Sequence, residues 1–323
     1  MNKVVDDELD GISSLYPNIL RRIPGTNIVV RKDAPVKDKV AIISGGGSGH
    51  EPMHTGFVGK GILDGAIAGE VFTAPTPDQI YTAIKEVQSG KGILLIINNY
   101  TGDVLNFKMA EELAIDDGID VRHVIVNDDI AIDAKESRRG VAGGMLIEKI
   151  AGAKAEAGAN LDEVLQITNR AIENTRSMGV ALSSCTIPRM GAPMFQIADD
   201  EIELGIGVHG EKGVKRTKLT SADDIASVLF DRISKELNLL RGDEAILLVN
   251  GMGSTPLMEL LIFSKAVLRL ARNAEIKVFG SIAGTFVTSL DMAGVSLSVL
   301  RVDDETKQLL ASPDSTPYFP KIL

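Results

Sequence analysis

The sequence predicts an α/β protein with two domains, and three observations support this prediction. Short β-branched runs alternate along the chain with segments whose apolar residues have helical spacing. Glycine is frequent, at 32 residues, whereas aromatic residues make up only 4%, a composition that favours tight strand-to-helix turns over a β-sandwich. The length of 323 residues allows two domains. We place them at 1–182 and 183–323, because residues 183–188 mark a change of element type.

The first half of the sequence alternates predicted strands and helices. Residues 40–44 are predicted to form a buried strand that leads into a glycine-rich loop at 45–49. Thr76-Pro77-Asp78-Gln79 is a capping box with proline at the first helical position, so it predicts a helix that ends near Gly90. We then expect a strand at Ile93–Ile97, a helix at Leu105–Ala114 and a strand at Val121–Val126. A further helix is predicted from the helical spacing of Leu161, Val164, Leu165, Thr168 and Ile172.

The second half continues the alternation. We predict a strand near 201–208 and another at 245–249. Residues 250–256, Asn-Gly-Met-Gly-Ser-Thr-Pro, form a loop that opens into a helix. Between the two strands lies a helix whose apolar side chains keep helical spacing, at Ile225, Val228, Leu229 and Ile233.

Composition and charge exclude several classes of protein. The chain has 34 basic and 44 acidic residues, a formal net charge of −10, which disfavours direct nucleic-acid binding. The single cysteine, Cys185, cannot form an internal disulfide and fits a reducing compartment. The N-terminus is acidic where a signal peptide would be basic, and the longest apolar stretches, such as Ile93–Ile97, are of strand length. We therefore expect a cytoplasmic protein that binds no membrane.

Two motif matches do not carry the chemistry that they suggest. His50-Glu51-Pro52-Met53-His54 matches the zinc-protease pattern, but that chemistry needs a helix and Pro52 disfavours one, so no metal site is predicted. Residues 205–210 match the dinucleotide pattern G-x-G-x-x-G, but the sequence after them lacks helical periodicity. No P-loop motif is present either. We expect no cofactor, and any phosphoryl transfer would need a nucleotide held by another protein.

The glycine-rich segment 45–49 has two interpretations. Consecutive glycines at the end of a strand let backbone N–H groups close on a small polar ligand or an anion. They also suit a sharp turn with close helix packing. His50, directly after the glycines, favours the ligand site, because an imidazole can donate or accept a proton near pH 7.

Asp103 and His209 also allow more than one interpretation. Asp103 follows a predicted buried strand, where open α/β sheets bind ligands, but it is also a suitable N-cap for the next helix. His209 is a general base, a nucleophile or a turn residue that satisfies a carbonyl. His54 and His123 are predicted to be structural, since His123 alternates within an apolar strand.

Eight segments distributed over nearly the whole chain form a recognisable series: Ser44-Gly-Gly-Gly-Ser-Gly-His-Glu-Pro52, Phe72-Thr-Ala-Pro-Thr-Pro-Asp78, Asn99-Tyr-Thr-Gly-Asp103, Arg138-Arg-Gly140, Cys185-Thr-Ile-Pro188, Gly205-Ile-Gly-Val-His-Gly-Glu211, Gly253-Ser-Thr-Pro-Leu257 and Thr288-Ser-Leu-Asp-Met292. In this order they resemble the substrate-binding subunit of dihydroxyacetone kinases that depend on the phosphotransferase system (the DhaK-type family).

The resemblance implies two α/β domains, each a mixed β-sheet with flanking helices, in a homodimer. It also implies that dihydroxyacetone is held covalently, as a hemiaminal on His209, with His50 and Asp103 as the acid/base pair. A separate subunit would carry the nucleotide. The residues that the resemblance assigns to ligand binding are Gly46, Gly47, Ser48, Gly49, Asn98 and Asp103.

Two departures from the kinase pattern bear on the role of the chain. Kinase subunits typically carry lysine before the Asn-Tyr-Thr-Gly-Asp motif, where this chain has Asn98. The segment 127–138 is also shorter than in those subunits and lacks their Thr-Ala-Gly. These changes favour the family's DhaQ-type paralogue, a dihydroxyacetone-binding coactivator that acts with a TetR-type transcription factor. The alternative is the kinase subunit, with a nucleotide-binding subunit as its partner.

Overall fold

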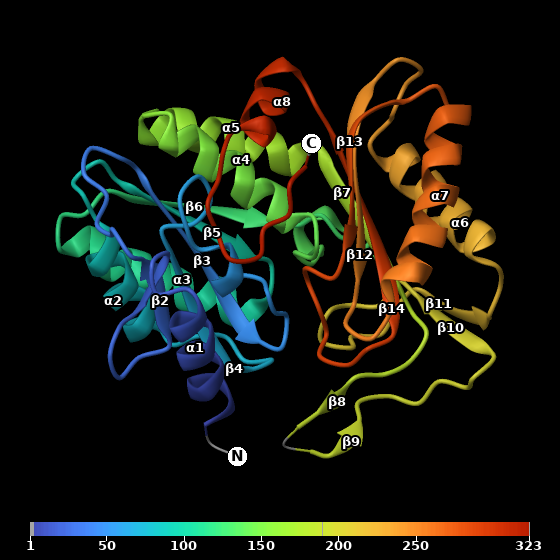
Figure 1. Cartoon of the computed structure of the whole chain (residues 1–323), viewed down its shortest axis with the longest axis horizontal. Helices are drawn as coiled ribbons and strands as arrows, with labels where there is room; N and C mark the ends of the chain where they lie inside the picture. The colour runs from blue at the N-terminus through green and yellow to red at the C-terminus, as the bar shows by residue number, and fades with distance from the viewer. Residues whose placement is uncertain (1–2, 189, 323) are drawn as a thin grey trace. The chain divides into compact units, whose positions relative to one another are not determined.

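The computed structural model describes residues 3–188 and 190–322, which form two compact units (Figure 1). The first unit comprises the chain up to Val126, together with Met145–Ala171 and Gln308–Phe319. The second comprises Asn127–Gly144, Ile172–Lys307 and the residues from Pro320 onward. The chain therefore passes from one unit to the other after Val126, Gly144, Ala171, Lys307 and Phe319.

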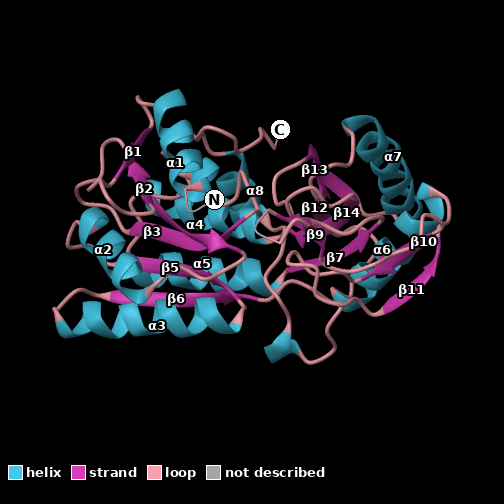
Figure 2. Cartoon of the chain, turned by 90° about the horizontal axis from the view of Figure 1, so that it is seen from below, coloured by secondary structure: helices cyan, strands magenta, loops and turns pink. Residues whose placement is uncertain are grey.

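The first unit is built on a mixed six-stranded sheet of order β1-β2-β4-β3-β5-β6. β3, β4, β5 and β6 run parallel to one another, and β1 and β2 are antiparallel to their neighbours. Figure 2 shows α3 lying along β6. The strands are β1 (Leu20–Arg22), β2 (Ile28–Arg31), β3 (Ala41–Ser48), β4 (Gly65–Val71), β5 (Ile93–Asn98) and β6 (Val121–Val126). The helices are α1 (Val4–Leu15), α2 (Pro77–Val87), α3 (Thr101–Asp116), α4 (Gly144–Glu156) and α5 (Leu161–Glu173).

A short C-terminal segment completes the first unit. Ser315 forms a β-bridge with Lys60, and the buried Lys149 of α4 donates hydrogen bonds to Ser312 O and to Asp314 Oδ2 at 2.6 and 2.8 Å. The fit is close, since a Cβ on Gly59 would lie 2.1 Å from Ser315 O. The segment from 312 to 315 is thus an integral part of the packing of this unit.

The second unit is built on another mixed six-stranded sheet, of order β11-β10-β7-β14-β12-β13. β12 and β13 are parallel and the other neighbours are antiparallel. α6 and α7 lie side by side against it (Figure 1). The strands are β7 (Thr175–Ala181), β10 (Glu201–Leu204), β11 (Lys215–Lys218), β12 (Glu244–Gly251), β13 (Lys277–Gly284) and β14 (Gly294–Arg301), with the small hairpin β8 (Thr186–Ile187) and β9 (Ala192–Pro193) outside the sheet. The helices are α6 (Ala222–Glu236), α7 (Leu257–Asn273) and α8 (Asp304–Ala311), the last of which carries the chain back to the first unit.

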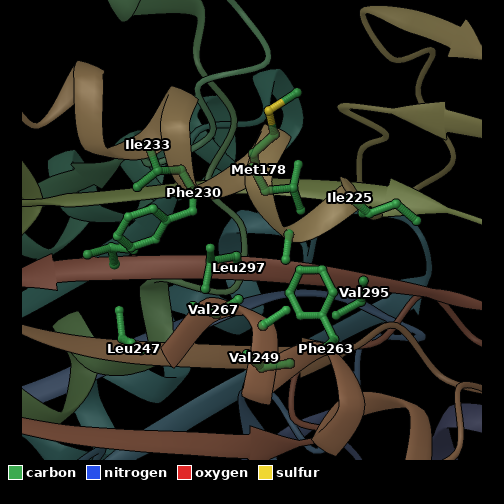
Figure 3. Close-up of a cluster of buried hydrophobic side chains, with 14 of the residues drawn as sticks. Met178, Ile225, Phe230, Ile233, Leu247, Val249, Phe263, Val267, Val295 and Leu297 are labelled. Atoms are coloured by element: carbon green, nitrogen blue, oxygen red, sulfur yellow. The ribbon is translucent and has the colours of Figure 1, made fainter. Parts of the chain in front are cut away.

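The core of the second unit lies between its sheet and the helices α6 and α7. Figure 3 shows Phe230 and Phe263 from the helices pointing toward Leu247 and Leu297 from the strands. Burial of such apolar surface stabilises the fold by roughly 25 cal/mol per Å². The α/β class with two mixed sheets and flanking helices, predicted from the sequence, is therefore confirmed.

The division between the units differs from the predicted boundary at 182/183. β7, at Thr175–Ala181, pairs with β14 and β10, so it is a central strand of the second sheet. The segment Asn127–Gly144 also belongs to the second unit. A change of element type in the sequence does not report which sheet a strand joins, because pairing partners are distant in the chain.

Most predicted elements are present, with three corrections. The glycine-rich loop at 45–49 is wrong in its first part, because β3 continues to Ser48. The predicted strand 201–208 ends at Leu204, where Gly205 takes a positive φ of 76°. The helix start at Pro77 is correct, but Thr76 makes no side-chain capping bond, and Gln79 Oε1 instead accepts from Asn27 N at 2.9 Å.

Among the residues that the structure describes, no helix is both long and apolar enough to cross a lipid bilayer.

Candidate functional site

The carboxyl ends of β3 and β5 bring the predicted site residues of the first unit to one edge of its sheet. Gly46, Gly47 and Ser48 end β3, and Asn98 ends β5. Asp103 lies in the first turn of α3, which starts directly after β5. Parallel strands present their carboxyl ends at the same edge, and this is where open α/β sheets bind ligands.

Gly46 differs from its two neighbours in the space that it faces. A Cβ on Gly45 would lie 2.4 Å from Ile67 O, and one on Gly47 would lie 2.6 Å from Thr73 N. These glycines are therefore required for the close approach of neighbouring backbone. A Cβ on Gly46 would instead lie 3.8 Å from His54 Nε2 and 3.9 Å from each carboxylate oxygen of Asp103. Gly46 thus faces a space with polar walls that holds a methyl-sized group.

His54, predicted to be structural, forms one wall of this space. Its Nδ1 lies 2.5 Å from Glu148 Oε1, and its Nε2 lies 3.5 Å from Asn98 Nδ2. The side chain of His54 is 8% exposed and that of Glu148 is fully buried. The imidazole is therefore held by α4 on one side and directed toward the ends of β3 and β5 on the other.

Asp103 is not the N-cap that one interpretation of the sequence suggested. The N-cap of α3 is Tyr100, and the carboxylate of Asp103 faces Gly46 from within the first helical turn. The residue is only 6% exposed. A carboxylate in the first turn of a helix is stabilised by the helix dipole. The position suits a group that exchanges a proton or a hydrogen bond with a ligand.

The turn after β3 is fixed by side chains of its own. His50 stacks on Phe72, with ring centroids 5.1 Å apart and planes at 18°. The Glu51 carboxylate accepts from Gly49 N at 2.9 and 3.0 Å, and burial raises its pKa. Ser48 Oγ donates to Gly69 O at 2.7 Å. Ser48, predicted to bind ligand, thus has its hydroxyl committed to the neighbouring strand.

A carboxylate beside this turn has an unusual proton affinity. Burial, and then the charge of Glu51, raise the pKa of Glu8 in α1 to about 7. Glu8 therefore gains a proton at a pH where carboxyl groups are ordinarily ionised.

In the second unit, His209 lies in a tight turn with Glu211. His209 Nδ1 is 2.9 Å from Glu211 Oε1, and Glu211 Oε2 accepts from His209 N at 2.9 Å. Burial raises the pKa of Glu211, but the hydrogen bond and charge of His209, with the charge of Arg139, outweigh it and lower this pKa to about 2. A neutral imidazole that donates from Nδ1 carries its lone pair on Nε2. The turn therefore selects the tautomer that a nucleophilic Nε2 requires.

Arg139 anchors the same turn to the rest of the second unit. It donates to Asp129 Oδ2 and to Gly205 O, each at 2.8 Å. Burial raises the pKa of Asp129 to about 6 although the Arg139 charge opposes this. The neighbouring Asp128 accepts from Val141 N, Gly143 N and Ser177 Oγ, at 2.8, 2.9 and 2.5 Å. The His209 turn is thus tied to a buried polar network.

The structure brings together Gly46, Asn98 and Asp103 of the predicted residues, and it adds His54 to them. His209 belongs to the second unit. Sequence reasoning missed two carboxylates, Glu148 and Glu211. Glu211 stands two residues after His209 and could have been found from that spacing. Glu148 lies 94 residues from His54, so no local signal points to it.

Comparisons with known proteins agree with this architecture. Residues 10–318 match the family model of the Dak1 domain. The chain is 48% identical, over 94% of its length and 93% of the relative, to the dihydroxyacetone-binding subunit DhaK of PTS-dependent dihydroxyacetone kinase 1 from Listeria innocua.

Two solved structures are also similar. The dihydroxyacetone kinase operon co-activator Dha-DhaQ has a TM-score of 0.92 at 38% identity, covering 96% of this chain and 97% of that one. The dihydroxyacetone kinase of C. freundii has a TM-score of 0.91 at 37% identity, covering 98% of this chain and 59% of that one. The chain belongs to the Dak1 domain family, with DhaK-type subunits among its relatives.

Proposed function

We propose that this chain binds dihydroxyacetone as a hemiaminal on His209. The observation that carries the proposal is the pairing of His209 Nδ1 with Glu211, because it leaves the lone pair of a neutral ring on Nε2. The dihydroxyacetone-binding relative from Listeria innocua supports the choice of ligand.

The proposed reaction is an addition with no leaving group. The Nε2 lone pair attacks the carbonyl carbon and forms a C–N bond, while the π electrons of the C=O bond move to oxygen. The oxygen takes a proton, with His50 and Asp103 as the acid/base groups. The positive charge on the ring is offset by the Glu211 carboxylate, which stays ionised because its pKa is about 2. Reversal of these steps releases the ketone.

A covalent bond explains how so small a ligand is selected. Non-covalent contacts give at best about 1.5 kcal/mol per non-hydrogen atom, and dihydroxyacetone has few atoms. Glycerol has comparable hydroxyl groups but no carbonyl, so it cannot form the adduct. The remaining contacts are proposed at Gly46, Gly47, Gly49 and Asn98.

The test is ¹³C NMR of dihydroxyacetone labelled at the carbonyl carbon. With the wild-type chain, the labelled resonance is expected to move from the ketone to the hemiaminal region. His209→Ala is expected to abolish this resonance. His123→Ala, which removes a histidine outside the proposed site, serves as the matched control. A hemiaminal resonance that persists in His209→Ala would refute the nucleophile.

For the cellular role, we propose a ligand-sensing coactivator that acts as a homodimer with a TetR-type transcription factor. Asn98 supports this role, because it offers hydrogen bonds where a lysine would supply a charge for phosphoryl transfer. The similarity to the Dha-DhaQ co-activator supports it as well. The homodimer predicts a mass of twice 34.4 kDa in light scattering, and a monomer would contradict it.

A second candidate role is the substrate-binding subunit of a dihydroxyacetone kinase. It is favoured by the 48% identity to the Listeria innocua subunit. Reconstitution with a kinase nucleotide subunit, ADP, Mg²⁺ and its phosphodonor system decides between the roles. Sustained formation of dihydroxyacetone phosphate would establish the kinase subunit. No turnover, with an authentic kinase subunit active in parallel, would favour the coactivator.

A further inference from the structure

His54 and Glu148 form a buried pair that the proposed reaction does not use. Glu148 is fully buried in α4, and only one of its oxygens, Oε1, contacts His54. Its other oxygen, Oε2, is buried and has no hydrogen-bond partner among the described residues. Burying a histidine–carboxylate pair is costly, and an apolar pair of similar volume is often at least as stable. Packing alone therefore gives little reason for this pair.

The orientation of the His54 imidazole gives a reason for burying this pair. With Nδ1 held by Glu148, the opposite nitrogen, Nε2, faces the space in front of Gly46. Both carboxylate oxygens of Asp103 lie 3.9 Å from the position of a Cβ on Gly46, against 3.8 Å for His54 Nε2. Gly46 itself is partly exposed although most of β3 is buried, so solvent reaches the carboxyl end of this strand. Two polar groups, one from α3 and one from the turn after β3, thus lie beside the same small space in front of Gly46.

We propose that this space is a subsite for one hydroxyl group of the ligand, and that His54 Nε2 accepts a hydrogen bond from that hydroxyl. Glu148 is a positioning residue, because it holds the Nδ1–H tautomer that leaves Nε2 as the acceptor. The inference rests on the proposed function and deepens it. It assigns His54 to the selection of a hydroxylated ketone, whereas His209 forms the covalent bond.

A second histidine–glutamate pair in the first unit serves as an internal control for the His54–Glu148 pair. His123 Nδ1 lies 2.6 Å from Glu111 Oε2, so it forms the same type of pair. That pair is partly exposed and joins α3 to β6, away from Gly46. If histidine–glutamate pairs served only to join elements, removal of either pair would have the same consequence for ligand selection.

The experiment compares dihydroxyacetone with hydroxyacetone, which lacks one hydroxyl. The variant His54→Phe/Glu148→Met removes both members of the pair, because removing one alone would leave the other buried without compensation. The control variant is His123→Phe/Glu111→Met. Dissociation constants for both ketones are measured by titration with each full-length protein, after circular dichroism has shown that the variants are folded.

The double variant at His54 is expected to bind dihydroxyacetone about tenfold more weakly, as for loss of one buried hydrogen bond. Its preference for dihydroxyacetone over hydroxyacetone is expected to fall by the same factor, because hydroxyacetone can place its single hydroxyl elsewhere. The control variant is expected to keep the wild-type preference. His54→Gln/Glu148→Met, whose amide places a polar atom close to the position of Nε2, is expected to restore part of the preference.

The outcomes separate this inference from the proposed function. An unchanged preference in a folded His54→Phe/Glu148→Met variant, with dihydroxyacetone still bound by the wild type, would overturn the hydroxyl subsite alone. An equal loss of preference in the control variant would also overturn it. Absence of any dihydroxyacetone binding to the wild-type chain would overturn the proposed function and the subsite together.

Discussion

Each unit of the molecule holds an imidazole by a carboxylate through Nδ1, but the two pairs are built differently. In the first unit, His54 and Glu148 come from elements 94 residues apart, and both are buried. In the second unit, His209 and Glu211 are two residues apart in one turn, and both are partly exposed. A group that must attack a ligand needs access, which a turn provides. A group that must select a hydroxyl needs a fixed position, which the packed fold provides.

The largest effect on ligand binding is expected at the His209–Glu211 pair, whose members are two residues apart in the sequence. Glu211→Gln removes the charge that holds the His209 tautomer and offsets the developing imidazolium. The rate of hemiaminal formation is expected to fall roughly 100-fold. Stopped-flow mixing with dihydroxyacetone measures this rate, with Glu111→Gln as the control. An unchanged rate would show that the Glu211 carboxylate only shapes the turn.

Replacing Gly46 or Gly47 by alanine tests the different surroundings of these two neighbouring glycines in the first unit. Gly47→Ala places Cβ against the backbone of Thr73, so it is expected to cost roughly 2 kcal/mol of unfolding free energy. Gly46→Ala meets only ordinary contact distances and is expected to change stability by less than about 1 kcal/mol. Its methyl group nevertheless occupies the proposed subsite, so dihydroxyacetone binding is expected to weaken. Urea denaturation and ligand titration measure the two effects, and equal stabilities of the two variants would contradict this account.

A smaller effect is expected from Asp103→Asn, which keeps the shape of the side chain but removes its acid/base function. Hemiaminal formation is expected to slow by about tenfold, since His50 remains. The comparison is made at fixed pH by the same stopped-flow measurement. If the rate stays at the wild-type value, Asp103 is not the acid/base group and acts in binding or in the packing of α3.

The smallest predicted effect concerns pH, where glutamates of the two units respond in opposite directions. The pKa of Glu8 is raised to about 7, whereas that of Glu211 is lowered to about 2. A carboxyl group with a raised folded-state pKa contributes stability below its unfolded value of 4.5, and this contribution is lost as the pH rises through 7. Glu8→Gln is therefore expected to be more stable than the wild type at pH 8, by roughly 1 kcal/mol, and to lose this advantage near pH 4.5.

Thermal unfolding at both pH values tests the Glu8 prediction. Asp7→Asn, on the exposed side of the same helix, is the control variant. A Glu8→Gln advantage that is the same at pH 4.5 and pH 8 would rule out titration of Glu8 as the cause.

Much of the fold could be predicted because its signals are local. The apolar run of β5, the limits of β6 and the helical spacing in α5 and α6 each lie within one short window. The extension of β3 through its glycines could not be predicted, since it depends on Ile67 and Thr73 approaching from neighbouring segments. The capping box failed for a similar reason, because Gln79 is engaged by Asn27 from another part of the unit.

The residues of the candidate site also divide into those predictable from local motifs and those that depend on distant parts of the chain. Gly46, Asn98 and Asp103 were predicted from a recognisable order of motifs, and strand ends in an α/β sheet do bring such residues together. The sequence predicts a structural role for His54, and nothing local in the sequence points to its partner Glu148. The buried carboxylate of Glu148 on α4 reaches His54 only once that helix has packed in the folded unit.

The repeated passage of the chain between the units has a consequence for biosynthesis. The first unit needs Gln308–Phe319, whose residues close over Gly59 and receive the hydrogen bonds of Lys149. A ribosome must therefore translate Gln308–Phe319 before the first unit can close. Until then the nascent chain exposes the surface that this segment covers, and transiently exposed surface of this kind favours aggregation.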